Sequence, residues 1–167
     1  MSACCSIEGG ECRLAKPGVC PHCGKKGKAV STLTVKSLVR DHALVSAERS
    51  HYFCRTPECD AVYFSESGVF LKPDLKVRVG IKEREDPAPL CYCFDYTRAD
   101  IRREMQESGA STIPERIKAE VQAGFCACEV KNPSGACCLG EITRAVRETK
   151  ENAVRDGPIN LMRRAKS

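Results

Sequence analysis

Thirteen cysteines in 167 residues constrain the fold of this chain more than any other sequence feature. With five Phe, four Tyr and no Trp, the chain has few large apolar side chains, so metals or disulfides are expected to stabilise its core. An odd number of cysteines suits a secreted disulfide framework poorly, and the first residues lack the apolar run of a secretion signal. No apolar run is long enough to span a bilayer. We therefore expect a cytoplasmic metal-binding protein with reduced thiols and no membrane insertion.

The cysteines are distributed in three groups along the chain. A charged stretch that ends in Pro87 and Pro89 separates the second group from the third, and it lacks the pattern of a core element. We place a boundary near Pro87. The predicted organisation is a flexible cysteine-containing segment at 1–16, a zinc-binding unit at 17–86, a second metal unit at 87–154 and a basic tail at 155–167.

The two units differ in their expected secondary structure. Residues 29–39, 51–54, 60–64 and 75–79 are rich in Val, Thr, Leu and aromatic side chains, which predicts strands. In the second unit, Thr97 with Asp100 and Thr112 with Glu115 are capping pairs that predict two helices, and Gly140 begins a third. The predicted fold class is α+β, with a small β-rich unit followed by a helical one.

The first set of paired cysteines has the spacing of a zinc site. The pattern is C-x2-C-x30-C-x4-C, and the glycine after the first pair allows the tight turn that directs two thiolates at one ion. Four thiolates make a closed tetrahedral shell, which is typical of structural rather than catalytic zinc. The predicted ligands are Cys20, Cys23, Cys54 and Cys59.

Two alternatives remain open for this first site. A rubredoxin-like iron would use the same four cysteines. His22 and His51 are near enough in sequence to be considered as substitute ligands, although a structural or exposed imidazole is the favoured interpretation for both.

The second set begins with Cys91 and Cys93, whose single intervening residue suits an iron–sulfur core better than a zinc knuckle. The pairs that follow are Cys126/Cys128 and Cys137/Cys138. The last pair directly precedes a predicted helix, whose free amides stabilise an anion such as a four-thiolate [2Fe–2S] centre. Spacing alone does not choose between the members of each later pair.

Together these motifs resemble the N-terminal [2Fe–2S]/zinc domain of CopZ-type copper chaperones over roughly residues 17–154. The more distant bacterioferritin-associated ferredoxin pattern has a C-x2-C pair that is missing after Cys93. The resemblance implies a helical [2Fe–2S]-binding unit with Cys91, Cys93, Cys128 and Cys138 as cluster ligands. It leaves Cys126 and Cys137 as alternates, either packed thiols or thiols with a resolving or soft-metal role.

The copper-carrying motif Met-x-Cys-x-x-Cys of CopZ-type proteins does not occur in this sequence. The resemblance therefore implies an auxiliary in copper or other soft-metal handling that acts with a separate carrier or transporter and an electron donor. Adjacent thiols are soft ligands, so a candidate site for Cu(I), Hg(II) or As(III) is formed by Cys4, Cys5 and Cys12.

The charge and the missing motifs disfavour nucleic-acid binding and enzymatic functions. The formal net charge is +5, but two four-thiolate centres would bring it to about +1, and few aromatic side chains are available to stack on bases. Nucleic acid is thus a disfavoured partner. Hydrolase and nucleotide-binding motifs are missing, which predicts an electron-transfer or metal-carrier protein rather than an enzyme, with metal-ion reduction left open. The alternative is a metal- or redox-responsive zinc-ribbon-like module that binds nucleic acid or a protein.

Overall fold

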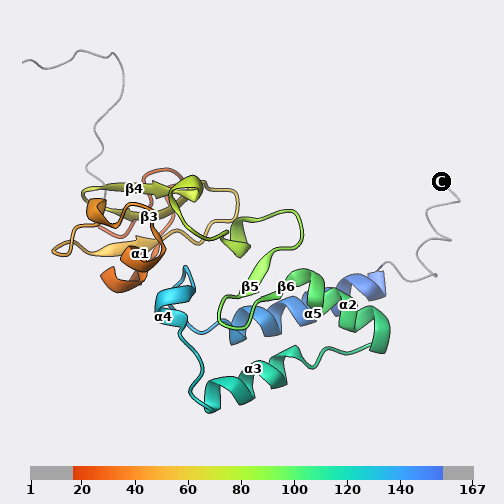
Figure 1. The fold of residues 1–167 in the computed structure, drawn as a ribbon. Helices are drawn as coiled ribbons and strands as arrows, with labels where there is room; N and C mark the ends of the chain where they lie inside the picture. Colours follow the sequence, from red (N-terminus) through yellow and green to blue (C-terminus); the bar gives the residue numbers. More distant parts are fainter. Residues whose placement is uncertain (1–16, 156–167) are drawn as a thin grey trace, which may run out of the picture.

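The computed structural model describes residues 17–155. The candidate soft-metal cysteines Cys4, Cys5 and Cys12, and nearly all of the predicted basic tail, lie outside the described residues. Two regions lie side by side in Figure 1, a small sheet with a short helix and a group of longer helices. The α+β prediction is confirmed.

The first region is built on an antiparallel meander in which each strand pairs with the next. Val62 and Tyr63 on the central strand are fully buried in a core that also includes Val35 and Leu75. The strands predicted near residues 51–54 and 60–64 are confirmed. The four strands are β1 (Lys28–Val30), β2 (His51–Phe53), β3 (Ala61–Ser65) and β4 (Gly68–Leu71).

The strand predicted over residues 29–39 is wrong for most of its length. Only β1 is extended, and helix α1 (Thr32–Leu38) follows it. The hydroxyl of Ser31 accepts a 3.1 Å hydrogen bond from the Thr34 amide, which caps the helix, while Val35 and Leu38 are buried in the core. A good N-cap and burial at helical spacing therefore outweigh the β propensity of Thr and Val.

The strand predicted over residues 75–79 is also wrong. In this segment the structure has only an isolated bridge between Val39 and Leu75, although Leu75 and Val79 are buried in the core. The edge strand is instead β4, which forms a tight hairpin with β3. The alternation of buried and exposed side chains over residues 75–79 thus arises from packing against the sheet and not from hydrogen-bonded strand pairing. Short 3-10 turns occur at η1 (His42–Leu44), η2 (Lys72–Asp74) and η3 (Gly80–Lys82).

The second region is mainly helical, as predicted. The first capping pair is confirmed, because the Asp100 carboxylate accepts a 2.8 Å hydrogen bond from the Thr97 amide and the Thr97 hydroxyl accepts one from the Asp100 amide. Ile101, Ile117 and Ile142 are fully buried in one core. The elements are β5 (Pro89–Cys91), β6 (Tyr96–Thr97), α2 (Arg98–Ser108), α3 (Ile113–Gln122), α4 (Cys128–Lys131) and α5 (Leu139–Arg155).

The second predicted capping box does not form. The Thr112 side chain makes no cap hydrogen bond, and the Thr112 amide donates instead to the carboxylate of Glu104 at 2.9 Å. A carboxylate from the preceding helix thus replaces the local cap. The helix predicted to begin at Gly140 is α5, which begins one residue earlier, at Leu139.

The two regions meet through α4, which packs against α1 between the sheet and the longer helices (Figure 1). The charged stretch that precedes Pro89 is ordered as well. Asp86 pairs with Arg98 at 3.0 Å and also with Arg102, and Lys82 is almost fully buried. No helix within residues 17–155 is long and apolar enough to cross a membrane.

Candidate metal centres

The first pair of cysteines lies on a tight turn near the start of the described chain. The Cys20 amide donates to the carbonyl oxygen of Lys25 at 2.9 Å, and the Gly24 amide donates to that of Cys20 at 2.8 Å. Gly24 has a φ of +69°, in the left-handed region where glycine is favoured. This turn directs the thiols of Cys20 and Cys23 to one side.

The second pair lies at the end of β2 and in the loop that follows it. The Cys54 amide donates to the carbonyl oxygen of Val62 at 2.9 Å, and the Cys59 amide donates to that of Thr56 at 3.2 Å. The sheet therefore holds Cys54, and a second tight turn returns Cys59 toward it.

The four thiols form one compact group. The Cys20 and Cys59 sulfurs lie 3.9 Å apart, those of Cys23 and Cys54 lie 3.6 Å apart, and all four sulfurs lie within 4.8 Å of one another. Ligands at about 2.3 Å from a tetrahedral ion lie roughly 3.8 Å from each other. The donor set and its spacing thus fit a tetrahedral thiolate site.

The thiols in this group differ in acidity. Burial opposes ionisation of Cys23, but hydrogen bonds from the Thr56 hydroxyl and the Lys25 amide outweigh it and lower the pKa of Cys23 to about 6. Burial raises the pKa of Cys59 to about 12. At neutral pH Cys23 is therefore ready to bind a cation, whereas Cys59 must first lose a proton.

A buried lysine from the charged stretch between the two predicted units supports this group. Lys82 is only 4% exposed, and its ammonium donates to the carbonyl oxygens of Thr56 at 2.8 Å and Cys59 at 2.9 Å. These two hydrogen bonds fix the loop that carries Cys59. The position of Lys82 at the start of a charged stretch gave no signal of this role.

The histidines are not part of the group. His51 is buried, with Nε2 2.8 Å from the carbonyl oxygen of Ser46, and its Nδ1 has no hydrogen-bond partner among the described residues. His22 is exposed. Neither belongs to the set of side chains that converge on one point, which favours the four cysteines.

The second set of cysteines comes together from three segments, β5, α4 and the start of α5. The Cys93 and Cys128 sulfurs lie 3.7 Å apart. Cys91 and Cys138 pack in one buried cluster, and the Cys138 thiol outweighs burial and lowers the pKa of Cys91 to about 6. The same interaction, together with burial, raises the pKa of Cys138. The four residues implied by the resemblance thus form two pairs.

The alternates differ in position. Cys137 is exposed, whereas Cys138 is 2% exposed and packs in the helical core. Cys126 is half-buried, and its sulfur lies 3.1 Å from that of Cys128. Burial raises the pKa of Cys128, while the hydrogen bond with Cys128 lowers that of Cys126. Geometry therefore separates Cys137 from Cys138 but keeps Cys126 and Cys128 together.

A tyrosine between the first two cysteines of this set attaches them to the first region. The Tyr92 phenol donates to the carbonyl oxygen of Arg78 at 2.9 Å and accepts from the Gly80 amide at 2.8 Å. Burial raises its pKa, which keeps the phenol protonated. The Tyr92 side chain therefore attaches the segment of Cys91 and Cys93 to the first region.

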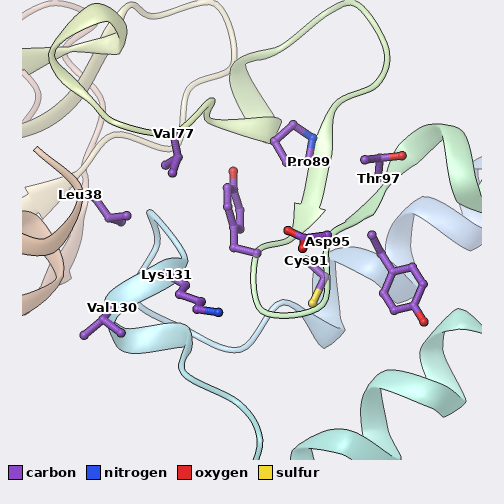
Figure 2. Close-up of a pocket in the computed structure, with 10 residues that line it drawn as sticks. Leu38, Val77, Pro89, Cys91, Asp95, Thr97, Val130 and Lys131 are labelled. Atoms are coloured by element: carbon purple, nitrogen blue, oxygen red, sulfur yellow. The ribbon is translucent and has the colours of Figure 1, made fainter. Parts of the chain in front are cut away.

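Beside Tyr92 lies an open pocket of about 420 Å³ between the two regions. Figure 2 shows Leu38 and Val77 on the side of the first region, with Cys91 and Lys131 on the side of the second. Asp95, which has a positive φ of 57°, closes the turn after Cys93 and lines the same pocket. Cys91 thus forms part of a wall that faces an accessible space.

Comparison with known proteins identifies relatives of this chain. Residues 17–76 match the zf_CopZ family, described as a zinc binding domain. The chain is 38% identical over 125 residues to the copper chaperone CopZ of Archaeoglobus fulgidus, a match that covers 75% of this chain and 60% of that relative. It also matches the X-ray structure of the Archaeoglobus fulgidus CopZ N-terminal domain, with 37% identity and a TM-score of 0.62, over 75% of this chain and 95% of that one.

The fold and the two groups of thiols define a cysteine-rich α+β protein with sites of the metal-binding type. Within that class, the chain belongs to the family of CopZ N-terminal domains. The resemblance stated from the motifs is confirmed. The chain spans about 60% of the length of the curated relative.

Proposed function

We propose that this protein binds one zinc ion and one [2Fe–2S] cluster and serves as a metal-carrier or electron-transfer auxiliary in the handling of copper or another soft metal. The observation that supports it most is the arrangement of eight cysteines as a compact group of four and two further pairs. We propose residues 17–86 as the zinc unit and 87–154 as the cluster unit.

The zinc ligands in this proposal are Cys20, Cys23, Cys54 and Cys59. Their compact tetrahedral spacing leaves no position for substrate, and the match of residues 17–76 to a zinc binding domain supports the choice of metal. Zinc would cross-link the turn before β1 to the loop after β2. Zinc would thereby stabilise the sheet against which the region of the second site packs.

The proposed cluster ligands are Cys91 with Cys138 and Cys93 with Cys128. A [2Fe–2S] centre requires two thiolates at each iron, which matches two separate pairs. The Ala127 amide donates to the Cys93 sulfur at 3.3 Å, and Cys138 directly precedes α5, whose first amides favour an anion. When bound, such a centre would supply one electron, enough to convert one Cu(II) to Cu(I).

The soft-metal role is supported by the likeness to a protein named copper chaperone CopZ. We propose that a separate copper or soft-metal carrier or transporter receives the metal, and that an electron donor serves the second site. No catalytic residue is required for such a role.

A matched pair of variants tests the proposal. Under anaerobic conditions, the full chain should be bleached by dithionite and recover its visible absorption on addition of about one equivalent of Cu(II). Cys138→Ser should lose iron and the visible absorption, whereas Cys137→Ser, which changes the exposed neighbour, should retain both. Failure to reduce the chromophore, or equal iron loss in both variants, would contradict the electron-transfer role or the ligand assignment respectively.

A further inference from the structure

Three sulfurs converge in the second region, one more than the proposed cluster would use there. Cys93, Cys126 and Cys128 have their sulfurs within 4.8 Å of one another, with 3.7 Å between Cys93 and Cys128 and 3.1 Å between Cys126 and Cys128. The proposed cluster uses the first and the last of them. Cys126 is therefore an additional donor that the proposed function does not employ.

The backbone holds Cys126 against the other two. The amide of Ala127, which lies between Cys126 and Cys128, donates to the Cys93 sulfur at 3.3 Å. This bond holds the loop against Cys93, with the sulfurs of Cys126 and Cys128 within 4.8 Å of the Cys93 sulfur. By contrast, Cys137 stands next to Cys138 in sequence but is exposed and does not join either group of converging donors among the described residues.

We propose that Cys93, Cys126 and Cys128 form a three-coordinate site for Cu(I) that is available when the cluster is absent. Three soft donors without a fourth in the group suit Cu(I), since structural zinc almost always takes four ligands. Binding displaces a proton from each thiol that is still protonated and involves no electron transfer. The inference rests on the proposed function for the idea that copper reaches this protein.

Because the Cu(I) site and the proposed cluster share Cys93 and Cys128, they exclude each other. The same region would then hold either a redox centre or a copper ion. The three-sulfur group is more accessible than the four-thiol group of the first region. Cys126 is half-buried and follows Phe125, which is 69% exposed, whereas three of the four thiols of the first group are buried. Copper would therefore enter from the loop at Cys126.

The test is a Cu(I) titration of the full chain with Cys4, Cys5 and Cys12 changed to Ser, so that the N-terminal thiols do not contribute. Cluster-free protein that retains its zinc competes with a chromogenic Cu(I) chelator, and zinc release is followed in the same titration. We expect one Cu(I) to bind without zinc release. Cys126→Ser should bind it at least tenfold more weakly, and Cys137→Ser should bind it as the parent does.

Copper X-ray absorption provides a second measurement that does not depend on relative affinities. It should give three sulfur neighbours in the parent and fewer in Cys126→Ser. Equal affinity of Cys126→Ser and its parent, an unchanged sulfur count, or full Cu(I) binding by protein that keeps its cluster would overturn the proposal. Iron content reports separately on the proposed function, because the titration is run on cluster-free chain whether or not the purified protein contains iron.

Discussion

The phenolic oxygen of Tyr63 donates a hydrogen bond of 2.8 Å to the carbonyl oxygen of Pro133, which lies 70 positions away in the sequence. Tyr63 is fully buried on the central strand β3, and Pro133 belongs to the loop between Cys128 and Cys138. Lys28 on β1 adds a 2.9 Å hydrogen bond to the carbonyl oxygen of the next residue, Ser134. The sheet thus positions the loop that joins two of the proposed cluster ligands.

Tyr63→Phe should weaken this connection. It leaves the Pro133 carbonyl oxygen buried without its partner, which costs about 1–3 kcal/mol of unfolding free energy. We expect faster iron loss while zinc is retained, because the first thiol group does not touch this bond. Denaturant unfolding and timed iron release to a chelator measure both effects.

Tyr52→Phe is the matched control, since Tyr52 stacks on Phe64 within the same sheet and its hydroxyl has no hydrogen bond among the described residues. It should leave iron release unchanged. Equal release rates for Tyr63→Phe and the parent would show that the sheet does not position the second site.

A close backbone contact between Gly80 and Pro89 predicts a severe effect of Gly80→Ala. A methyl group at Gly80 would overlap the Pro89 carbonyl oxygen, and backbone atoms cannot move aside as a flexible side chain does. The start of β5 and the Tyr92 side chain should be displaced. We expect the variant to lose iron and its free energy of unfolding to fall by about 3 kcal/mol.

Gly140→Ala provides the comparison. Nothing lies within 4 Å of a methyl group at this position in α5, so the change should stabilise the fold by roughly 0.5 kcal/mol through helix propensity. Thermal unfolding of the two variants should therefore shift in opposite directions. A Gly80→Ala protein as stable as the parent would contradict the described contact.

Lys82→Met should weaken the first site although Lys82 is not a ligand. Removal of the ammonium leaves the carbonyl oxygens of Thr56 and Cys59 without their partner, at a cost of about 2–3 kcal/mol. Transfer of zinc to a chromogenic chelator should be faster. The exposed Lys76, which donates to the Ser37 carbonyl, gives the control Lys76→Met, in which transfer should be unchanged.

The pH dependence of zinc binding follows from the acidity of Cys23 and Cys59. Zinc binds thiolates, so protons compete with it and the affinity should rise with pH. With a pKa of about 6, Cys23 releases almost no proton at pH 7.5, whereas Cys59, with a pKa of about 12, releases one. The slope of affinity against pH should therefore steepen below about pH 6.

Thr56→Val tests the cause of the low pKa of Cys23, because it removes the hydroxyl 3.3 Å from that sulfur. Calorimetry in buffers of different ionisation enthalpy should detect up to about one additional proton released at pH 7.5. Thr143→Val, on α5, should leave the proton count unchanged. An unchanged count in Thr56→Val would contradict the assigned cause.

Most of the candidate site could be predicted from sequence because metal ligands occur as closely spaced pairs. The pairs Cys20/Cys23 and Cys91/Cys93 predict two sites, and in the structure Cys54 and Cys59 lie beside the first pair and Cys128 lies beside Cys93. The choice of Cys128 and Cys138 as ligands follows from the resemblance and not from spacing, and it stays a prediction. The proximity of Cys126 to Cys93 could not be inferred, since it depends on how the loop at Ala127 folds around a sulfur 34 positions away.

The fold was predictable at the level of class and least predictable where tertiary contacts decide. Residues 32–38 carry the Thr and Val typical of strands, yet the Ser31 cap and the buried face of Val35 make them a helix. Lys82 begins the charged stretch that lacks the pattern of a core element, and its burial could not be predicted because its partners are carbonyl oxygens 23 and 26 positions earlier. Such distant hydrogen bonds leave no local pattern.

Elemental analysis and a visible spectrum of one anaerobically purified sample test most directly whether this chain holds zinc and a [2Fe–2S] cluster. The sample should contain about one zinc, two irons and two sulfides per chain and show sulfide-to-iron charge-transfer absorption. A colourless protein that contains only zinc, in one or two equivalents, would contradict the cluster assignment and leave the second thiol group as a zinc or copper site.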